Sequence, residues 1–117
     1  MRKELRIRKN EEFASIIKKH KSISSDKFII YVQLKKEDNA RIGLSVSKKL
    51  GNAVVRNKIK RQIRMMLQEC VDFFVYPYDV IVIVRKNYLN DDYSGNKKDL
   101  EKLLKTVNIS EYRKESI

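Results

Sequence analysis

The sequence has little of what enzymes and metal sites usually need. Its 117 residues include one cysteine, one histidine, one proline, three glycines and no tryptophan. A single cysteine cannot form an internal disulfide, which indicates a reducing, cytoplasmic environment. One cysteine and one histidine cannot supply the four protein ligands of a structural zinc site. No Ser-His-Asp arrangement is supported either. We therefore expect no catalytic residues in this chain, and any reaction must be completed by a partner.

The isolated reactive residues have simple structural interpretations. His20 lies in a run of lysines, which favours a surface or phosphate contact over a catalytic base. Cys70 falls on an apolar helical stripe, where a buried thiol is inert. Asp91 and Asp92 are adjacent and indicate a turn or a helix start, and Gly51 stands alone and forms no phosphate-binding loop.

Long apolar runs are also missing. No run of 18 or more apolar residues occurs, so we expect no membrane span and no membrane partner. The basic start, Met1 to Glu4, leads into no apolar segment, so we expect no secretory signal. The 42% apolar share predicts a packed core. Without repeats or linkers, residues 1–117 should form a single domain, with a frayed polar tail over 108–117.

Positive charge is abundant and unevenly placed. The net charge is +12, yet residues 1–64 have 19 Lys and Arg against 6 Asp and Glu, whereas residues 65–117 have 8 against 9. The stretch from Lys48 to Arg64 contains seven cationic side chains and no acidic one. Such a charge favours binding to a polyanion, RNA or DNA. A membrane surface fits less well because exposed bulky apolar residues are expected there.

The apolar patterns predict an α+β fold. We expect helices packed on one mixed sheet of about four strands, in the order α-β-β-β-α-β-α. The expected elements are a helix from Asn10 to about His20, a short strand near Ser22 to Ser25, a strand from Phe28 to Leu34, its hairpin partner from Arg41 to Val46, a helix after Asn52, a buried strand from Tyr78 to Arg85, and a helix from about Ser94 to Val107.

The helix after Asn52 divides into two stripes. At 100° per residue the core stripe contains Ile59, Ile63, Met66, Leu67 and Cys70. The opposite stripe contains Asn57, Lys60, Arg61 and Arg64. Arg56 falls on the apolar side and is assigned to the entry of the helix. No glutamates are interleaved to form i,i+4 pairs, so a ligand-binding role is favoured over a merely solvated face.

Three aromatic residues are candidates for contact with bases. Phe28 and Tyr31 lie at odd separation in one strand, so their side chains point to opposite faces. One should belong to the core, and the other could stack on a base. Phe13 heads the apolar stripe of the first helix, for which core packing is the default interpretation. Periodicity alone does not separate these roles.

The central segment resembles the signature of the bacterial ribonuclease P protein subunit family. The similarity rests on Gly43 to Lys49, on the turn Gly51 to Val54 and on the helix start Arg56-Asn57-Lys58. The helix start Lys9 to Phe13 and the strands at Phe28 and at Tyr78 support it. It extends over roughly residues 5–107.

This resemblance implies a small protein subunit joined to a large catalytic RNA. In that family the RNA, with bound Mg²⁺, cleaves the 5′ leader from precursor tRNA, and no further protein partner is required. The basic helix would contact the RNA, and the first helix and the sheet would hold the single-stranded leader. The implied RNA-binding residues are Lys48, Lys49, Asn52, Arg56, Asn57, Lys58, Lys60, Arg61 and Arg64. The implied leader-binding residues are Phe13, Ile17 and Tyr31. The metal ligands are not assigned to protein residues.

Some positions depart from the family pattern. Ile17 stands where an aromatic is frequent, so only apolar contact is expected there. Lys58 replaces an arginine and loses its planar fork. Ser25-Asp26 stands where Asn-Arg is common. The resemblance also implies that the basic helix joins two parallel strands by a left-handed crossover, against the general rule.

Two other functions compete with this hypothesis. One is a non-catalytic RNA-binding protein, such as a ribosomal protein or an RNA chaperone, which composition alone cannot distinguish from a ribonuclease P subunit. The other is a DNA-binding regulator, which is less favoured because no turn and recognition-helix pair is visible in the sequence.

Overall fold

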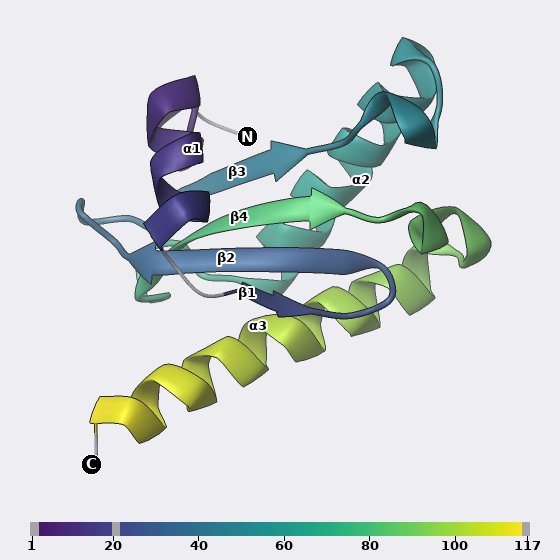
Figure 1. The fold of residues 1–117 in the computed structure, drawn as a ribbon. Helices are drawn as coiled ribbons and strands as arrows, with labels where there is room; N and C mark the ends of the chain where they lie inside the picture. Colours follow the sequence, from purple (N-terminus) through teal and green to yellow (C-terminus); the bar gives the residue numbers. More distant parts are fainter. Residues whose placement is uncertain (1–2, 20–21, 116–117) are drawn as a thin grey trace.

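The computed structural model describes residues 3–19 and 22–115, with side chains described as far as Val107. His20 lies outside the described residues. Figure 1 shows the arrangement of the elements. They are the helices α1 (Asn10–Lys19), α2 (Ala53–Cys70) and α3 (Tyr93–Glu115), the strands β1 (Ser22–Ser24), β2 (Phe28–Leu34), β3 (Ile42–Ser45) and β4 (Tyr78–Val84), and the short 3₁₀ turns η1 (Lys3–Leu5), η2 (Lys48–Leu50) and η3 (Lys86–Asn90).

The four strands form one mixed sheet in the order β1-β2-β4-β3. β2 pairs antiparallel with β1 and with β4, and β3 pairs parallel with β4. The predicted hairpin between β2 and β3 is therefore wrong, because β4 lies between them. β4 has the near-continuous apolar sequence of a strand buried on both faces, and the middle of the sheet is where such a strand fits.

The connection β3–α2–β4 joins parallel neighbours, as the family resemblance implied. Its left-handed sense stays a prediction.

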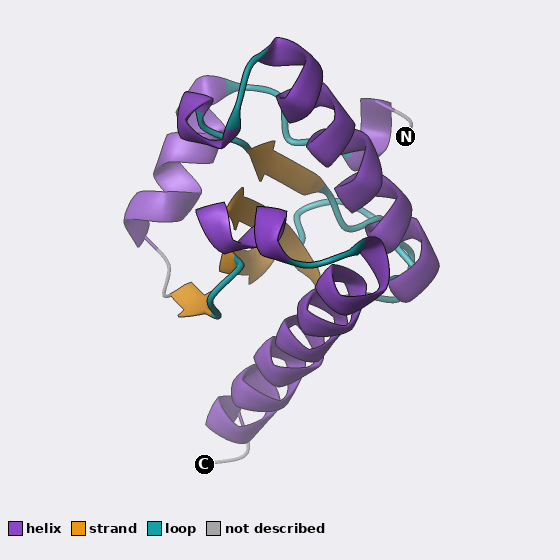
Figure 2. Ribbon diagram, turned by 90° about the vertical axis from the view of Figure 1, so that its right-hand side faces the viewer, coloured by secondary structure: helices purple, strands orange, loops and turns teal. Residues whose placement is uncertain are grey.

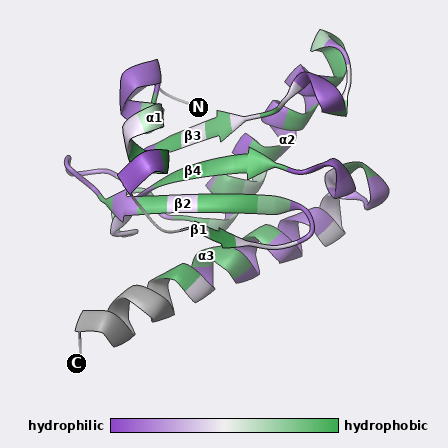
Figure 3. Cartoon of the chain, in the orientation of Figure 1, coloured by the Kyte–Doolittle hydropathy of each residue, from purple (hydrophilic) through white to green (hydrophobic). Residues whose placement is uncertain are grey.

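β4 is the most buried strand, with six of its seven residues buried. Hydrophobic residues concentrate on the strands, whereas hydrophobic and hydrophilic residues alternate along the helices (Figure 3).

Helices lie on both faces of the sheet. α2 and α3 cover one face and α1 lies on the other, as Figure 2 shows from the side. The larger core, under α2 and α3, contains Phe28, which is fully buried and packs edge-on against Tyr88 with ring centroids 5.8 Å apart. Phe28 is thus the core aromatic of β2, and Tyr31 faces the α1 side.

The C-terminal helix is longer than the sequence predicted. Leu100, Leu103, Leu104 and Val107 are buried as the spacing predicted. The helix nevertheless continues to Glu115, beyond the predicted end at Val107. Fraying of the tail over 108–117 stays a prediction. The apolar stripe ends at Val107, but no glycine or proline follows it to stop the backbone hydrogen-bond pattern.

Candidate nucleic-acid interface

A sharp turn sets the start of the basic helix. Gly51 has φ 147°, in the region that favours glycine, and an added Cβ would lie 2.8 Å from Val55. Asn52 then caps α2, because its Oδ1 accepts a hydrogen bond from the Val55 N–H at 3.1 Å. The exposed lysines Lys48 and Lys49 of η2 are consequently held beside the first turn of α2.

The two predicted stripes of α2 are confirmed by burial. Ile59, Ile63, Met66 and Leu67 are at most 2% exposed. The other face is accessible: Asn57, Lys58 and Arg61 are exposed, and Lys60 and Arg64 are half-buried. Arg56, on the apolar side at the helix entry, is half-buried as well.

Cys70, at the end of the core stripe, is only half-buried. Burial, aided by a hydrogen bond to Glu101, raises the pKa of its thiol to about 11, so it stays neutral at physiological pH. This agrees with the inert role that the sequence suggested.

Part of the basic stripe forms one wall of a cationic hollow. The hollow has a volume of about 240 Å³ and lies between α2 and the N-terminal segment. That segment runs along the outer edge of β3, where the Ile7 N–H donates to the Ile42 carbonyl at 2.9 Å. The lining residues are Arg6, Ile7, Arg8, Ile42, Leu44, Lys60 and Arg64. No acidic side chain is among them.

The charges in the cationic hollow are not compensated within it. The Arg6 Nε is buried and has no hydrogen-bond partner among the described residues. Desolvation by burial, together with the positive charge of Arg6, lowers the pKa of Arg64. Two guanidinium groups held close in this way favour an anion between them. The sequence prediction included Lys60 and Arg64 but missed Arg6 and Arg8. The only sign of these two in the sequence is that they flank the apolar Ile7.

This geometry predicts that a small divalent anion binds in the cationic hollow and stabilises the folded protein. Sulfate at about ten times its Kd should raise the free energy of unfolding by about 1.4 kcal/mol. The melting temperature should then rise by about 4 °C or more, which thermal unfolding followed by circular dichroism can measure. Sodium chloride at equal ionic strength is the control for screening. Arg64→Ala should lose most of the sulfate effect, and an unchanged response in this variant would contradict the assignment.

A second, apolar surface lies on the α1 side of the sheet. Phe13 and Ile17 of α1 and Tyr31 of β2 are half-buried around Ile16 and Ile81. The structure thus brings the three predicted leader-binding residues together. An added Cβ at Gly43 would lie 2.7 Å from the Phe13 ring, so the glycine lets the ring approach β3 closely.

The strand register shows how this surface continues beyond α1. Tyr31 lies opposite Ile81, and the next row on the same face pairs Ile29 with Ile83. Ile83 lies in turn beside Ser45 of β3. Ile29, Ile83 and Ser45 are all half-buried and were not in the predicted site. Their signal was the alternation of the strands, which became usable only once the pairing partners were known.

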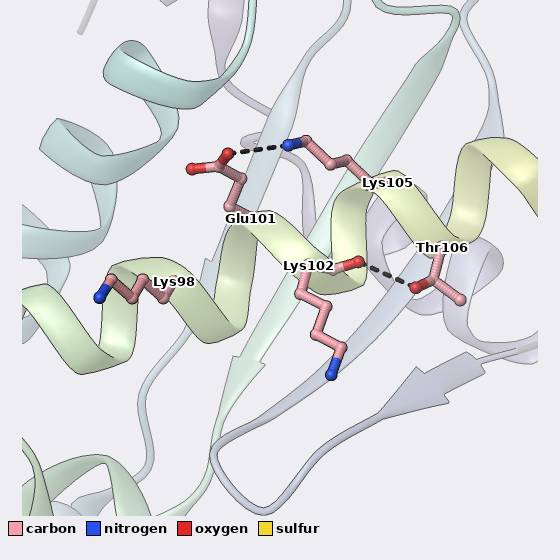
Figure 4. A pocket seen from close by; sticks show the side chains of 5 residues that line it. All are labelled: Lys98, Glu101, Lys102, Lys105 and Thr106. Carbon is pink, nitrogen blue, oxygen red and sulfur yellow. Dashed lines mark hydrogen bonds and ion pairs between the residues drawn. The ribbon is translucent and has the colours of Figure 1, made fainter.

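Other features of the described residues are weaker candidates. A larger hollow of about 390 Å³ runs along α3, lined by Lys98, Glu101, Lys102, Lys105 and Thr106 (Figure 4). All five come from one helix, and Glu101 already pairs with Lys105 at 3.0 Å, so the described residues supply no opposing wall. Among the residues described, no group of three or more metal-ligating side chains occurs. None of the described helices is long and apolar enough to cross a membrane.

Together, the cationic helix and the apolar sheet face define a small α+β nucleic-acid-binding protein. Comparison with known proteins identifies the family within this class: the family model for ribonuclease P matches residues 1–108. The ribonuclease P protein component of Bacillus cereus strain B4264 is 43% identical over 116 residues, spanning 97% of this chain and all of the relative. That of Mesoplasma florum is 43% identical over 99 residues, spanning 84% of this chain and 90% of the relative.

Solved structures of RNase P proteins show the same fold. A mutant of the Staphylococcus aureus RNase P protein with defective mRNA degradation activity superposes with a TM-score of 0.81 at 40% identity, covering 91% of this chain and 90% of the other. The Thermotoga maritima RNase P protein gives 0.75 at 29% identity, covering 86% and 96%. The chain therefore belongs to the ribonuclease P protein family, the protein components of the ribonucleoprotein endoribonuclease that processes the 5′ end of tRNA.

Proposed function

We propose that this protein works in the cytoplasm and binds the catalytic RNA of ribonuclease P through α2, η2 and the cationic hollow. The observation that supports this most strongly is the hollow itself, because two separate segments place arginines and a lysine around one space, and none of its described lining residues is acidic. A phosphate of the RNA backbone has the charge to bind between these side chains. The remaining positions, Asn57, Lys58 and Arg61, extend the same face along α2.

The α1 side of the sheet is proposed to bind the 5′ leader of precursor tRNA. Single-stranded RNA is bound by stacking of its bases on aromatic and apolar side chains. Tyr31 and Phe13 supply rings and Ile17 supplies apolar contact, all on one surface. We therefore propose that the leader is bound largely by stacking.

The chemical step is proposed to belong to the RNA partner. Mg²⁺ supplies the Lewis acidity and the activated water when bound. The described residues offer no cluster of carboxylate, histidine or cysteine ligands for it, so we place the ion mainly on the RNA. The protein's part is to hold phosphates and the leader in place, and to lower the Mg²⁺ concentration that the RNA needs by adding fixed positive charge.

Reconstitution tests the proposal directly. The protein is added to the ribonuclease P RNA of its host at low Mg²⁺, and cleavage of a 5′-labelled precursor tRNA is followed. We expect cleavage that the RNA alone does not support at that Mg²⁺ concentration. An equally basic ribosomal protein is the control for non-specific charge. No stimulation with the cognate RNA, or equal stimulation by the control, would overturn the proposal and favour a general RNA chaperone.

A further inference from the structure

A buried ionic bridge joins α1 to the sheet beside the proposed leader-binding surface. Arg41, just before β3, donates from Nη2 to Asp79 Oδ2 at 2.9 Å and from Nη1 to Glu12 Oε1 at 2.7 Å. Its backbone N–H also donates to Asp79 Oδ1 at 2.9 Å. The exposed fractions of the three side chains are 12%, 0% and 25% for Arg41, Asp79 and Glu12, so water screens these contacts poorly.

The two halves of the bridge differ in what they hold. Asp79 is fixed within the sheet, because it accepts two hydrogen bonds from Arg41 and a third from Gln33 of β2 at 3.2 Å. Burial alone would lower the pKa of Arg41, but the hydrogen bonds and charges of Glu12 and Asp79 outweigh it and raise that pKa. Glu12 belongs to α1, and Arg41 is its one side-chain partner among the described residues. The Glu12–Arg41 pair is therefore the ionic link between helix and sheet.

This link lies near a tight contact between the helix and the sheet. Phe13 follows Glu12 on α1, and Gly43 lies two residues after Arg41 on β3. The Phe13 ring is so close to Gly43 that a methyl group there would be 2.7 Å away. A shift of α1 away from the sheet would move Phe13 and Ile17 relative to Tyr31, which belongs to the sheet.

We propose that Glu12 and Arg41 are positioning residues that fix the distance of α1 from the sheet and its place along the strands. They thereby set the spacing of Phe13 and Ile17 relative to Tyr31 in the leader-binding surface. The inference rests on the proposed function of that surface. The two residues need not touch the leader, because they act through Phe13 and Ile17. An ordinary structural pair would stabilise the fold and affect every RNA contact alike, whereas a positioning pair affects leader binding selectively.

Glu12→Gln and Glu11→Gln make a matched pair of variants. Both lie in the first turn of α1, and both changes remove one negative charge. Glu11 is exposed, and its side chain forms no hydrogen bond or ion pair among the described residues. Each variant is assembled with the RNA subunit, and its Kd is measured for precursor tRNA and for mature tRNA without the leader. Thermal melting of each variant establishes that it is folded at the assay temperature.

We expect Glu12→Gln to reduce the ratio of precursor to mature tRNA affinity by about fivefold, and Glu11→Gln to leave it unchanged. Equal ratios in the two variants would show that the bridge is only structural and would overturn the inference. If the unchanged protein shows no preference for leader-bearing tRNA, the proposed function of the surface fails instead. Loss of affinity for both tRNAs in Glu12→Gln alone, with the ratio intact, would also count against positioning.

Discussion

Replacing Tyr31 by alanine should weaken binding of leader-bearing precursor tRNA by about 10-fold or more, and leave binding of mature tRNA nearly unchanged. Tyr31 is half-buried on the α1 side of the sheet, next to Phe13 and Ile17. Because the side chain is only partly buried, a leader base can stack on the exposed part of its ring. Stacking of one base is worth about 1–3 kcal/mol. Equilibrium binding of the two tRNAs by the assembled ribonucleoprotein measures the difference.

The matched control for this prediction is Tyr31→Phe, which keeps the ring and removes only the hydroxyl. It should retain most of the leader preference. Phe28→Ala serves as the opposite control, because Phe28 lies fully buried on the other face of the same strand. It should destabilise the protein without a selective effect on the leader. Equal losses for both tRNAs in Tyr31→Ala would show that Tyr31 contributes to the core and not to stacking.

Replacing Asp79 by asparagine should lower the free energy of unfolding by about 3–5 kcal/mol. Asp79 is fully buried and accepts from the Arg41 guanidinium and backbone. Asparagine keeps the shape but removes the charge, so the largely buried Arg41 would be left with Glu12 alone. Breaking one side of a buried pair costs much more than the pair itself contributes, because the remaining charge stays desolvated.

Urea denaturation followed by circular dichroism measures this loss. Asp26→Asn is the control, because Asp26 is exposed in the turn between β1 and β2 and has no hydrogen bond or ion pair among the described residues. It makes the same chemical change and should shift the free energy of unfolding by less than about 0.5 kcal/mol. A loss below about 1 kcal/mol in Asp79→Asn would show that Glu12 and rearranged water compensate for the missing charge.

Local patterns in the sequence were enough to predict most of the elements. The strand from Phe28 to Leu34 and the two stripes of α2 follow from residue types a few positions apart, and the structure confirms them. The pairing of β3 with β4 did not follow, because strand neighbours are chosen by burial across the whole sheet. The two strands are separated in the chain by all of α2, and no local signal connects them.

In the candidate site, too, the residues on regular elements could be predicted, and those brought in by tertiary contacts could not. The cationic face of α2 could be read from its spacing, but Arg6 and Arg8 could not, because their segment is too short for periodicity and joins the site only through contact with β3. Strand alternation placed Phe28 and Tyr31 on opposite faces without telling which face was covered more completely. Only the packing of α2 and α3 against Phe28 decided it.

The central place of β4 determines when the molecule can fold. β2 and β3 share no direct strand pairing and are joined only through β4, which ends at Val84. During synthesis the chain from α1 through β4 must therefore leave the ribosome before the sheet can close. Until then α2 has cationic side chains but no complete sheet to pack on. Folding is thus a late event for this chain, because the strand at the centre of the sheet is the last of the four to be synthesised.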